Sequence, residues 1–178
     1  MRRRASGRFS VMVITAAVLL LSVLDTHPAR AEDGVPQGWV GDFGVGFLAN
    51  TVDGTAFAFD MGFDRFVMKN VSVGPLFQLA NTPNLVQTGL SGQAKYWIDL
   101  ARGQNPIKLA LTGGIGFVHA SHGSTDTSFL IPIGAELDFE VNPKLHLTGS
   151  FLLNFTDLKT GPNNDTSVMP GLTVGVRF

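Results

Sequence analysis

Two sets of side chains in this sequence could carry chemistry, and the first is the pair His119 and Ser121. Residues two apart on a strand point to the same side, so this histidine could activate this serine hydroxyl as a nucleophile. That mechanism also needs a carboxylate to orient the histidine. Glu136 has the opposite parity and lies several residues along the following segment, and Asp126 could serve only through a loop. We therefore expect no catalytic residue, and we expect His119 and Ser121 to be polar residues of a loop.

The second set consists of charged residues that share one alternating register. Its acidic members are Asp42, Asp60, Asp64, Asp99, Glu136, Asp138 and Glu140, and its basic members are Lys95, Lys108 and Arg177. Gln78, Gln93, His146, Thr148, Ser150 and Asn154 belong to the same register. Buried charges are costly unless they are paired and hydrogen-bonded. What this set can do therefore depends on whether its register faces water or an interior.

The elements that position both sets follow from the alternation of apolar and polar residues. It predicts eight strands, at Trp39–Leu48, Thr55–Asp64, Val71–Ala80, Gln87–Leu100, Ile107–Val118, Ser128–Val141, Leu145–Phe155 and Val168–Phe178. Their lengths match the ~9 to 11 residues of a tilted transmembrane strand, with some overhang. Within these bounds the apolar register holds no Asp, Glu, Lys or Arg. This exclusion indicates that one face of the strands meets hydrocarbon.

The N-terminal segment has the pattern of a secretory signal. Four arginines among the first eight residues precede an uncharged stretch from Phe9 to Leu24, and Ala29-Arg30-Ala31 supplies small residues for cleavage after Ala31. The uncharged stretch is shorter than the ~20 residues of a membrane-spanning helix. We expect residues 1–31 to be a signal peptide that is removed, and residues 32–178 to form one barrel domain.

The mature chain would be acidic. Cleavage removes five of the 13 basic and one of the 14 acidic residues, which leaves eight basic and thirteen acidic residues and a net charge near −5 with neutral histidines. No basic patch remains to indicate nucleic acid as a partner. Cysteine is absent, so the exported chain would be stable without disulfides.

The last predicted strand ends in Val174-Gly175-Val176-Arg177-Phe178, with an aromatic residue in the final position. Together with the signal segment and the uncharged face, this ending resembles the bacterial outer-membrane β-barrel family that includes the OmpA membrane domain and OmpX. The resemblance implies an all-β fold, an eight-stranded antiparallel up-and-down transmembrane β-barrel. It also implies a place in the cell outer membrane, among outer-membrane lipid. In that family the outer-membrane assembly machinery recognises a terminal aromatic residue, so Phe178 is the expected assembly signal.

An eight-stranded barrel has an interior about wide enough for its own side chains, so we expect a largely plugged lumen. Asp42, Asp64, Asp99 and Glu140 lie near predicted strand ends, and we expect them at a wet periplasmic mouth. Trp97 has lumen parity and belongs either to an aromatic girdle at the membrane interface or to the packed interior. The other charged residues are predicted to form a lumen polar network. Its members are Asp60, Lys95, Lys108, Glu136, Asp138 and His146.

The expected role is structural or a surface interaction, with no enzymatic activity, cofactor or metal. A surface ligand would bind at the predicted outer loops 119–127 and 156–167. One alternative is a narrow cation-preferring pore, because an acidic lining attracts cations. A remoter one is a lipid A-modifying enzyme, since the lipid A deacylase family uses a His-x-Ser pair on a strand that faces lipid. The last is a secreted lipocalin-like binding barrel, which has apolar residues inside and polar residues outside.

Overall fold

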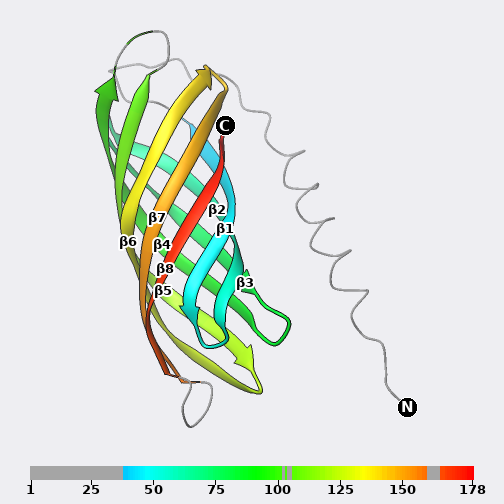
Figure 1. Ribbon diagram of the computed structural model, residues 1–178. Helices are drawn as coiled ribbons and strands as arrows, with labels where there is room; N and C mark the ends of the chain where they lie inside the picture. Colours follow the sequence, from blue (N-terminus) through cyan, green and yellow to red (C-terminus); the bar gives the residue numbers. More distant parts are fainter. Residues whose placement is uncertain (1–37, 102, 104–105, 160–164) are drawn as a thin grey trace. The chain divides into compact units, whose positions relative to one another are not determined.

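The computed structural model describes residues 38–101, 103, 106–159 and 165–178. In these ranges the chain forms one closed barrel of eight antiparallel strands, in which each strand pairs with its neighbours in sequence and β8 pairs with β1 (Figure 1). The strands are β1 Trp39–Thr51, β2 Gly54–Met68, β3 Val71–Asn81, β4 Val86–Ala101, β5 Ile107–His122, β6 Ser124–Asn142, β7 Leu145–Lys159 and β8 Asp165–Arg177. The predicted eight-stranded fold is confirmed, whereas the predicted signal peptide lies outside the described residues. Among the described residues, no helix is long and apolar enough to span a membrane.

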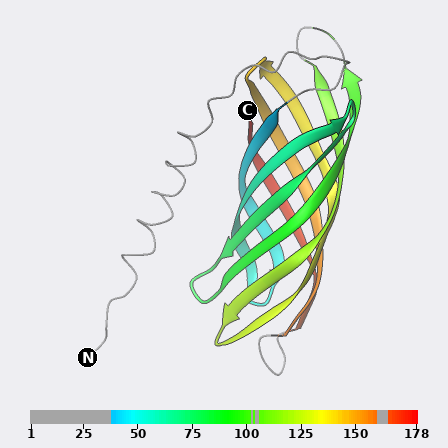
Figure 2. The same ribbon diagram turned by 180° about the vertical axis from the view of Figure 1, so that it is seen from behind.

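β1 begins and β8 ends at the same end of the barrel (Figures 1 and 2). We call this the terminal end, and we call the opposite end, with the β1–β2 and β5–β6 turns, the hairpin end. The seam between β1 and β8 runs from the pair Asp42 and Arg177 to the pair Leu48 and Gly171. Phe178 extends it, because Phe178 and Gly41 exchange two backbone hydrogen bonds of 3.0 Å. The sheet is thereby closed up to the last residue of the chain.

The outward register of the barrel is apolar. Large hydrophobic side chains on it are strongly exposed, among them Ile115 (71 %), Val174 (64 %) and Phe47 (61 %). The alternate residues of the same strands point inward, as the period of two requires. The inverted, lipocalin-like arrangement is therefore excluded, since it would place these apolar side chains inside the barrel.

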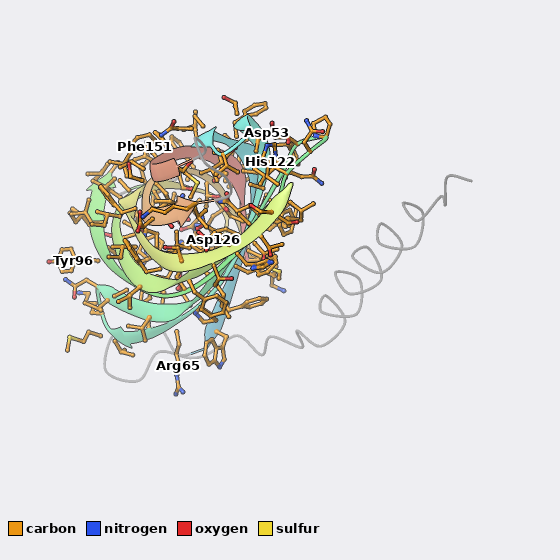
Figure 3. All side chains as sticks on the ribbon, turned by 90° about the horizontal axis from the view of Figure 1, so that it is seen from below. Asp53, Arg65, Tyr96, His122, Asp126 and Phe151 are labelled. Atoms are coloured by element: carbon orange, nitrogen blue, oxygen red, sulfur yellow. The ribbon has the colours of Figure 1, made fainter. Side chains whose placement is uncertain are left out.

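The strands are longer than the alternation predicts, and charged residues enter the outward register only in the added segments. β2 continues to Met68, which places Arg65 on the outside, opposite Trp39 of β1. Figure 3 shows Arg65 projecting away from the barrel wall. At the hairpin end, β7 adds the exposed residues Asp157 and Lys159. An uncharged band therefore lies between two charged borders.

The predicted outer loop 119–127 is a continuation of β5 and β6, so this part of the prediction is wrong. His119 pairs with Thr127 and Ser121 pairs with Thr125, and Gly123 turns the chain with a φ of 72°. The alternation persists there because Ala120 points into the barrel and is fully buried. The outward residues His119, Ser121 and Thr127 are polar and exposed, as expected where a strand rises above hydrocarbon into water.

The interior of the barrel is divided into two halves of different chemistry. The half at the hairpin end is an apolar cluster of buried residues: Leu48, Ala56, Ala58, Ala80, Leu85, Val118, Ala120, Leu130, Leu158 and Met169. The half at the terminal end is charged. Inward glycines keep the strands close, since a Cβ atom at Gly46 or Gly116 would overlap the backbone oxygen of Leu172 or Leu90 on the neighbouring strand.

Candidate functional site: the buried ion-pair network

Lys95 of β4 is the centre of the charged half of the interior. Its ammonium nitrogen lies 2.9 Å from Asp64 Oδ2, 3.0 Å from Glu136 Oε2 and 3.6 Å from Asp42 Oδ2. Lys95, Asp64 and Glu136 are almost fully buried. Charge-assisted hydrogen bonds of this kind offset the cost of removing the charges from water. They tie β1, β2, β4 and β6 together across the lumen.

The sequence places Asp42 and Asp64 near strand ends, but the structure places both inside the barrel and not at its mouth. Space for Asp42 comes from Gly62, its partner in the β1–β2 register. A Cβ atom at position 62 would overlap the Asp42 carboxylate. The stagger of the tilted strands then brings these two acids to the level of Lys95.

A second ion-pair group lies nearer the terminal end. Asp138 Oδ2 is 2.8 Å from an Arg177 terminal nitrogen, and Asp138 Oδ1 is 2.8 Å from His146 Nδ1. The Arg177 guanidinium carbon lies 4.4 Å from the centre of the Trp97 ring, in cation–π geometry. The Trp97 indole N–H donates to Ser72 Oγ at 2.9 Å. Trp97 is thus part of the packed interior and covers the network at the terminal end.

The remaining predicted network residues are placed differently. Asp60 does not contact Lys95 and instead accepts hydrogen bonds from Gln78 Nε2 at 3.4 Å and from Thr173 Oγ1 at 3.2 Å. Lys108 is half-buried and lies opposite Asp99 of β4 and Asp138 of β6 in the register. In the described part of the chain, the interior ion pairs of Glu136 and Asp138 are made with Lys95, Arg177 and His146, and none with Lys108.

Two small cavities lie between the apolar cluster and the ion pairs. About 20 Å³ is available to the centres of water molecules in the first cavity, beside Lys95 and Glu136, and about 10 Å³ in the second, beside Asn154. Each has room for about one water molecule. Asp60, Ser150, Leu152 and Thr173 line both cavities. The polar interior therefore holds water-sized spaces in a packed barrel.

His119 and Ser121 point outward from β5 and are exposed, as their parity predicts. His119 Nδ1, however, lies 2.7 Å from the hydroxyl of Thr127. Asp126, the nearby acid, accepts the backbone N–H of Thr127 at 2.8 Å and that of Lys159 at 2.6 Å. Both carboxylate oxygens are therefore engaged, one within β6 and the other in a link from β6 to β7. The carboxylate that a histidine–serine nucleophile requires is engaged elsewhere.

A link between turns at the hairpin end is not evident from the sequence. Asp53 accepts a short hydrogen bond from the Thr82 hydroxyl and lies 3.9 Å from His122 Nδ1. Figure 3 shows Asp53 and His122 side by side at the rim. Three connections distant in sequence are thus held together. In the residues that the structure covers, no group of three or more His, Cys, Asp or Glu side chains could hold a metal ion.

No protein-family model and no curated protein matches this sequence. Among solved structures, the crystal structure of Neisserial surface protein A is similar, with a TM-score of 0.54 and 19 % identity over 78 % of this chain and 94 % of that one. This chain has the fold of the eight-stranded outer-membrane β-barrels. The N-terminal barrel domain of Pseudomonas aeruginosa OprF is also similar, with a TM-score of 0.49 and 16 % identity over 80 % of this chain and 98 % of that one. The crystal structure of Ail of Yersinia pestis has a TM-score of 0.44 and 14 % identity over 80 % of this chain and 99 % of that one.

The outer-membrane barrel fold accounts for both faces of the strands. In hydrocarbon every backbone amide must be paired within the protein, and a closed sheet achieves this without free edges. In barrels of this fold the outward apolar band meets lipid and the interior is polar, and here the charged inward residues Lys95, Glu136 and Asp138 form ion pairs. Apolar side chains outside and charged side chains inside are the reverse of the distribution in a soluble domain.

Proposed function

We propose that this protein is an integral outer-membrane barrel with a closed lumen and a structural or surface-interaction role, and that it is not an enzyme. One observation carries the proposal. The interior is filled at two successive levels, by the apolar cluster toward the hairpin end and by the Lys95 and Arg177 ion pairs toward the terminal end. A barrel plugged in this way is a rigid base for whatever its exposed hairpins present.

The hairpin end is the proposed interaction surface. The β5–β6 hairpin carries the outward polar residues His119, Ser121 and Thr127, all exposed. β7 adds Asp157 and Lys159, whose side chains form an exposed pair at 3.2 Å. The predicted ligand region 156–167 includes residues 160–164, which lie outside the described residues. A mixed-charge surface of this type favours a polar ligand or partner outside the cell.

Planar-bilayer recording tests the closed lumen. We expect the purified, folded protein to insert without producing stable conductance steps, because charged and apolar side chains obstruct the lumen at two levels. Insertion is verified in the same membranes by protection from protease and by a band that shifts on boiling. Reproducible cation-selective steps from the unmodified protein would contradict the proposal. They would favour the narrow cation-preferring pore, for which the excess of buried carboxylates is the supporting observation.

Replacement of Phe178 tests the proposed route into the outer membrane. We expect Phe178→Ala, and deletion of Phe178, to lower the amount of heat-modifiable barrel in the outer-membrane fraction severalfold. Phe178→Tyr, which keeps the aromatic ring, should assemble normally. The measurement is electrophoresis of separated membrane fractions with and without boiling in detergent.

Refolding in vitro separates recognition of Phe178 from stability. The Phe178 ring lies over Gly41, 3.0 Å from where a Cβ atom of that glycine would be, so its loss removes some packing as well. If Phe178→Ala refolds in vesicles to near wild-type stability but fails to accumulate in cells, recognition is affected. Normal accumulation of Phe178→Ala in the outer membrane would contradict the role of Phe178 as the assembly signal.

A further inference from the structure

We propose that the cavity beside Lys95 and Glu136 binds a monovalent metal cation of the size of Na⁺. Asp42 and Glu136 would hold the ion, with Asp60 on the same cavity wall. The cavity lies at the boundary between the charged half of the interior and the middle of the barrel. This inference is independent of the proposed surface role of the hairpins.

The balance of charge around the cavity is the first argument. Asp42, Asp60 and Glu136 line it together with a single cation, Lys95. Lys95 also pairs with Asp64, whose carboxylate is just outside the lining. Four carboxylates around one ammonium leave an excess of negative charge in a buried site, and burying uncompensated charge is costly. A bound cation would remove part of this excess.

Carboxylate oxygens without hydrogen-bond partners are the second argument. Glu136 is only 5 % exposed, and its Oε2 contacts Lys95. Its Oε1 is buried and has no hydrogen-bond partner among the described residues. Asp42 Oδ2 is likewise buried without a hydrogen-bond partner. Its distance to Lys95 Nζ is 3.6 Å, the longest of the three carboxylate contacts of that nitrogen. Buried carboxylate oxygens are seldom left in this state without a water or an ion.

The lining and the size of the cavity favour a small, hard, singly charged ion. Neutral oxygen atoms are available from the hydroxyls of Thr112, Thr148, Ser150 and Thr173. Hard cations prefer such oxygen ligands. About 20 Å³ is available to the centres of water-sized spheres, which suits one unhydrated Na⁺ or one water. A Ca²⁺ site needs 6 to 8 oxygens, and among the described residues no group of three or more acidic side chains could hold one metal ion together.

Access to the site would be from the terminal end. On the other side of the cavity lies the apolar cluster, with Leu130 and Met169 fully buried, and the polar groups there are the few that line the second cavity, such as Gln87 and Asn154. An ion held there stabilises the barrel and does not cross it.

Unfolding of the full protein in phospholipid vesicles tests this site. Urea unfolding is measured while NaCl replaces choline chloride at constant total salt, because choline is too large for the cavity. For one site, the unfolding equilibrium constant should fall about tenfold for each tenfold rise in Na⁺ above the dissociation constant. Sodium NMR provides the direct measurement, as excess line broadening in the presence of the folded protein.

Two variants and one control locate the effect. Glu136→Gln and Asp42→Asn should each abolish the dependence on Na⁺ and the line broadening. Asp42→Asn is the milder change, because Lys95 keeps its contacts of 2.9 and 3.0 Å, so it serves if Glu136→Gln does not fold. Asp157→Asn, an exposed acid outside the lumen, should behave as the wild type.

Three results would overturn the proposal. Equal stability of the wild type in NaCl and choline chloride would show that salt acts only by screening. Retention of the Na⁺ dependence in both Asp42→Asn and Glu136→Gln would show that the ion binds elsewhere. If stability depends on pH but not on the cation, protons neutralise the carboxylates and no metal ion is bound.

Discussion

Replacing Lys95 with methionine should destabilise the folded barrel by about 3 to 5 kcal/mol, the cost typical of removing one partner from a buried ion pair. Methionine fills nearly the same volume, so the effect is electrostatic. Without the ammonium, the carboxylates of Asp64 and Glu136 lose contacts of 2.9 and 3.0 Å and stay buried. Their mutual repulsion and lost hydration then oppose folding. Urea unfolding in vesicles, followed by the heat-dependent band shift, measures the change.

The rescue by two further changes makes this prediction specific. Removing the stranded charges in Lys95→Met with Asp64→Asn and Glu136→Gln should recover most of the lost stability, because a whole buried ion pair is often replaceable by neutral groups at little cost. Lys144→Met removes an exposed charge from the β6–β7 turn and should change stability little. A Lys95→Met barrel as stable as wild type would show that the network contributes no pairing energy.

Arginine at position 133 should destabilise the barrel by about 2 to 4 kcal/mol, as cationic side chains do at the middle of a lipid-facing strand. Ile133 is 50 % exposed on the outward register of β6. Its direct neighbours are Gly113 of β5 and Leu153 of β7. No polar partner is opposite it in the register, so the guanidinium would have to reach a membrane border or draw water into hydrocarbon.

The cost of an arginine on a lipid-facing surface depends on its depth in the membrane, so a second position near the interface tests whether this face meets lipid. Val141 lies on the same strand and the same face near the terminal end, 54 % exposed. Val141→Arg should cost only about 0 to 1 kcal/mol, because it would lie near the membrane interface. Comparable costs at both positions, or a neutral Ile133→Arg, would mean that this face does not meet lipid. Unfolding from vesicles of defined lipid composition provides both values.

The number and order of the strands could be predicted because the two solvents impose a period of two on the whole chain. The ends of the strands could not be predicted, because the outward residues become polar beyond the membrane border while the strand itself continues. His119 and Ser121 look like loop residues, and only the inward Ala120 preserves the pattern there. The useful signal would have been the register of small inward residues, read without regard to the outward polarity.

The membership of the ion-pair network was harder to predict than the fold. Position along a strand does not give depth in a barrel, because the strands are tilted and staggered by their hydrogen-bond register. Asp42 appears terminal in the sequence, yet its pairing with Gly62 places it beside Lys95. Arg177 was assigned to the inward register, but its pairing with Asp138 depends on the closure of β8 against β1 and β7. Such cross-lumen contacts follow from three-dimensional register alone.

The seam completed by Gly41 and Phe178 has a consequence for how this chain becomes a barrel. The first strand to be synthesised has its second neighbour only when the last one arrives, so closure must wait until the whole polypeptide has been made. Since the two ends meet, the covalent order of the strands is not essential to the final sheet. A circular permutant, joined by a short linker between Phe178 and Gly38 and opened at the Lys69–Asn70 turn, should form the same barrel with a different closing seam.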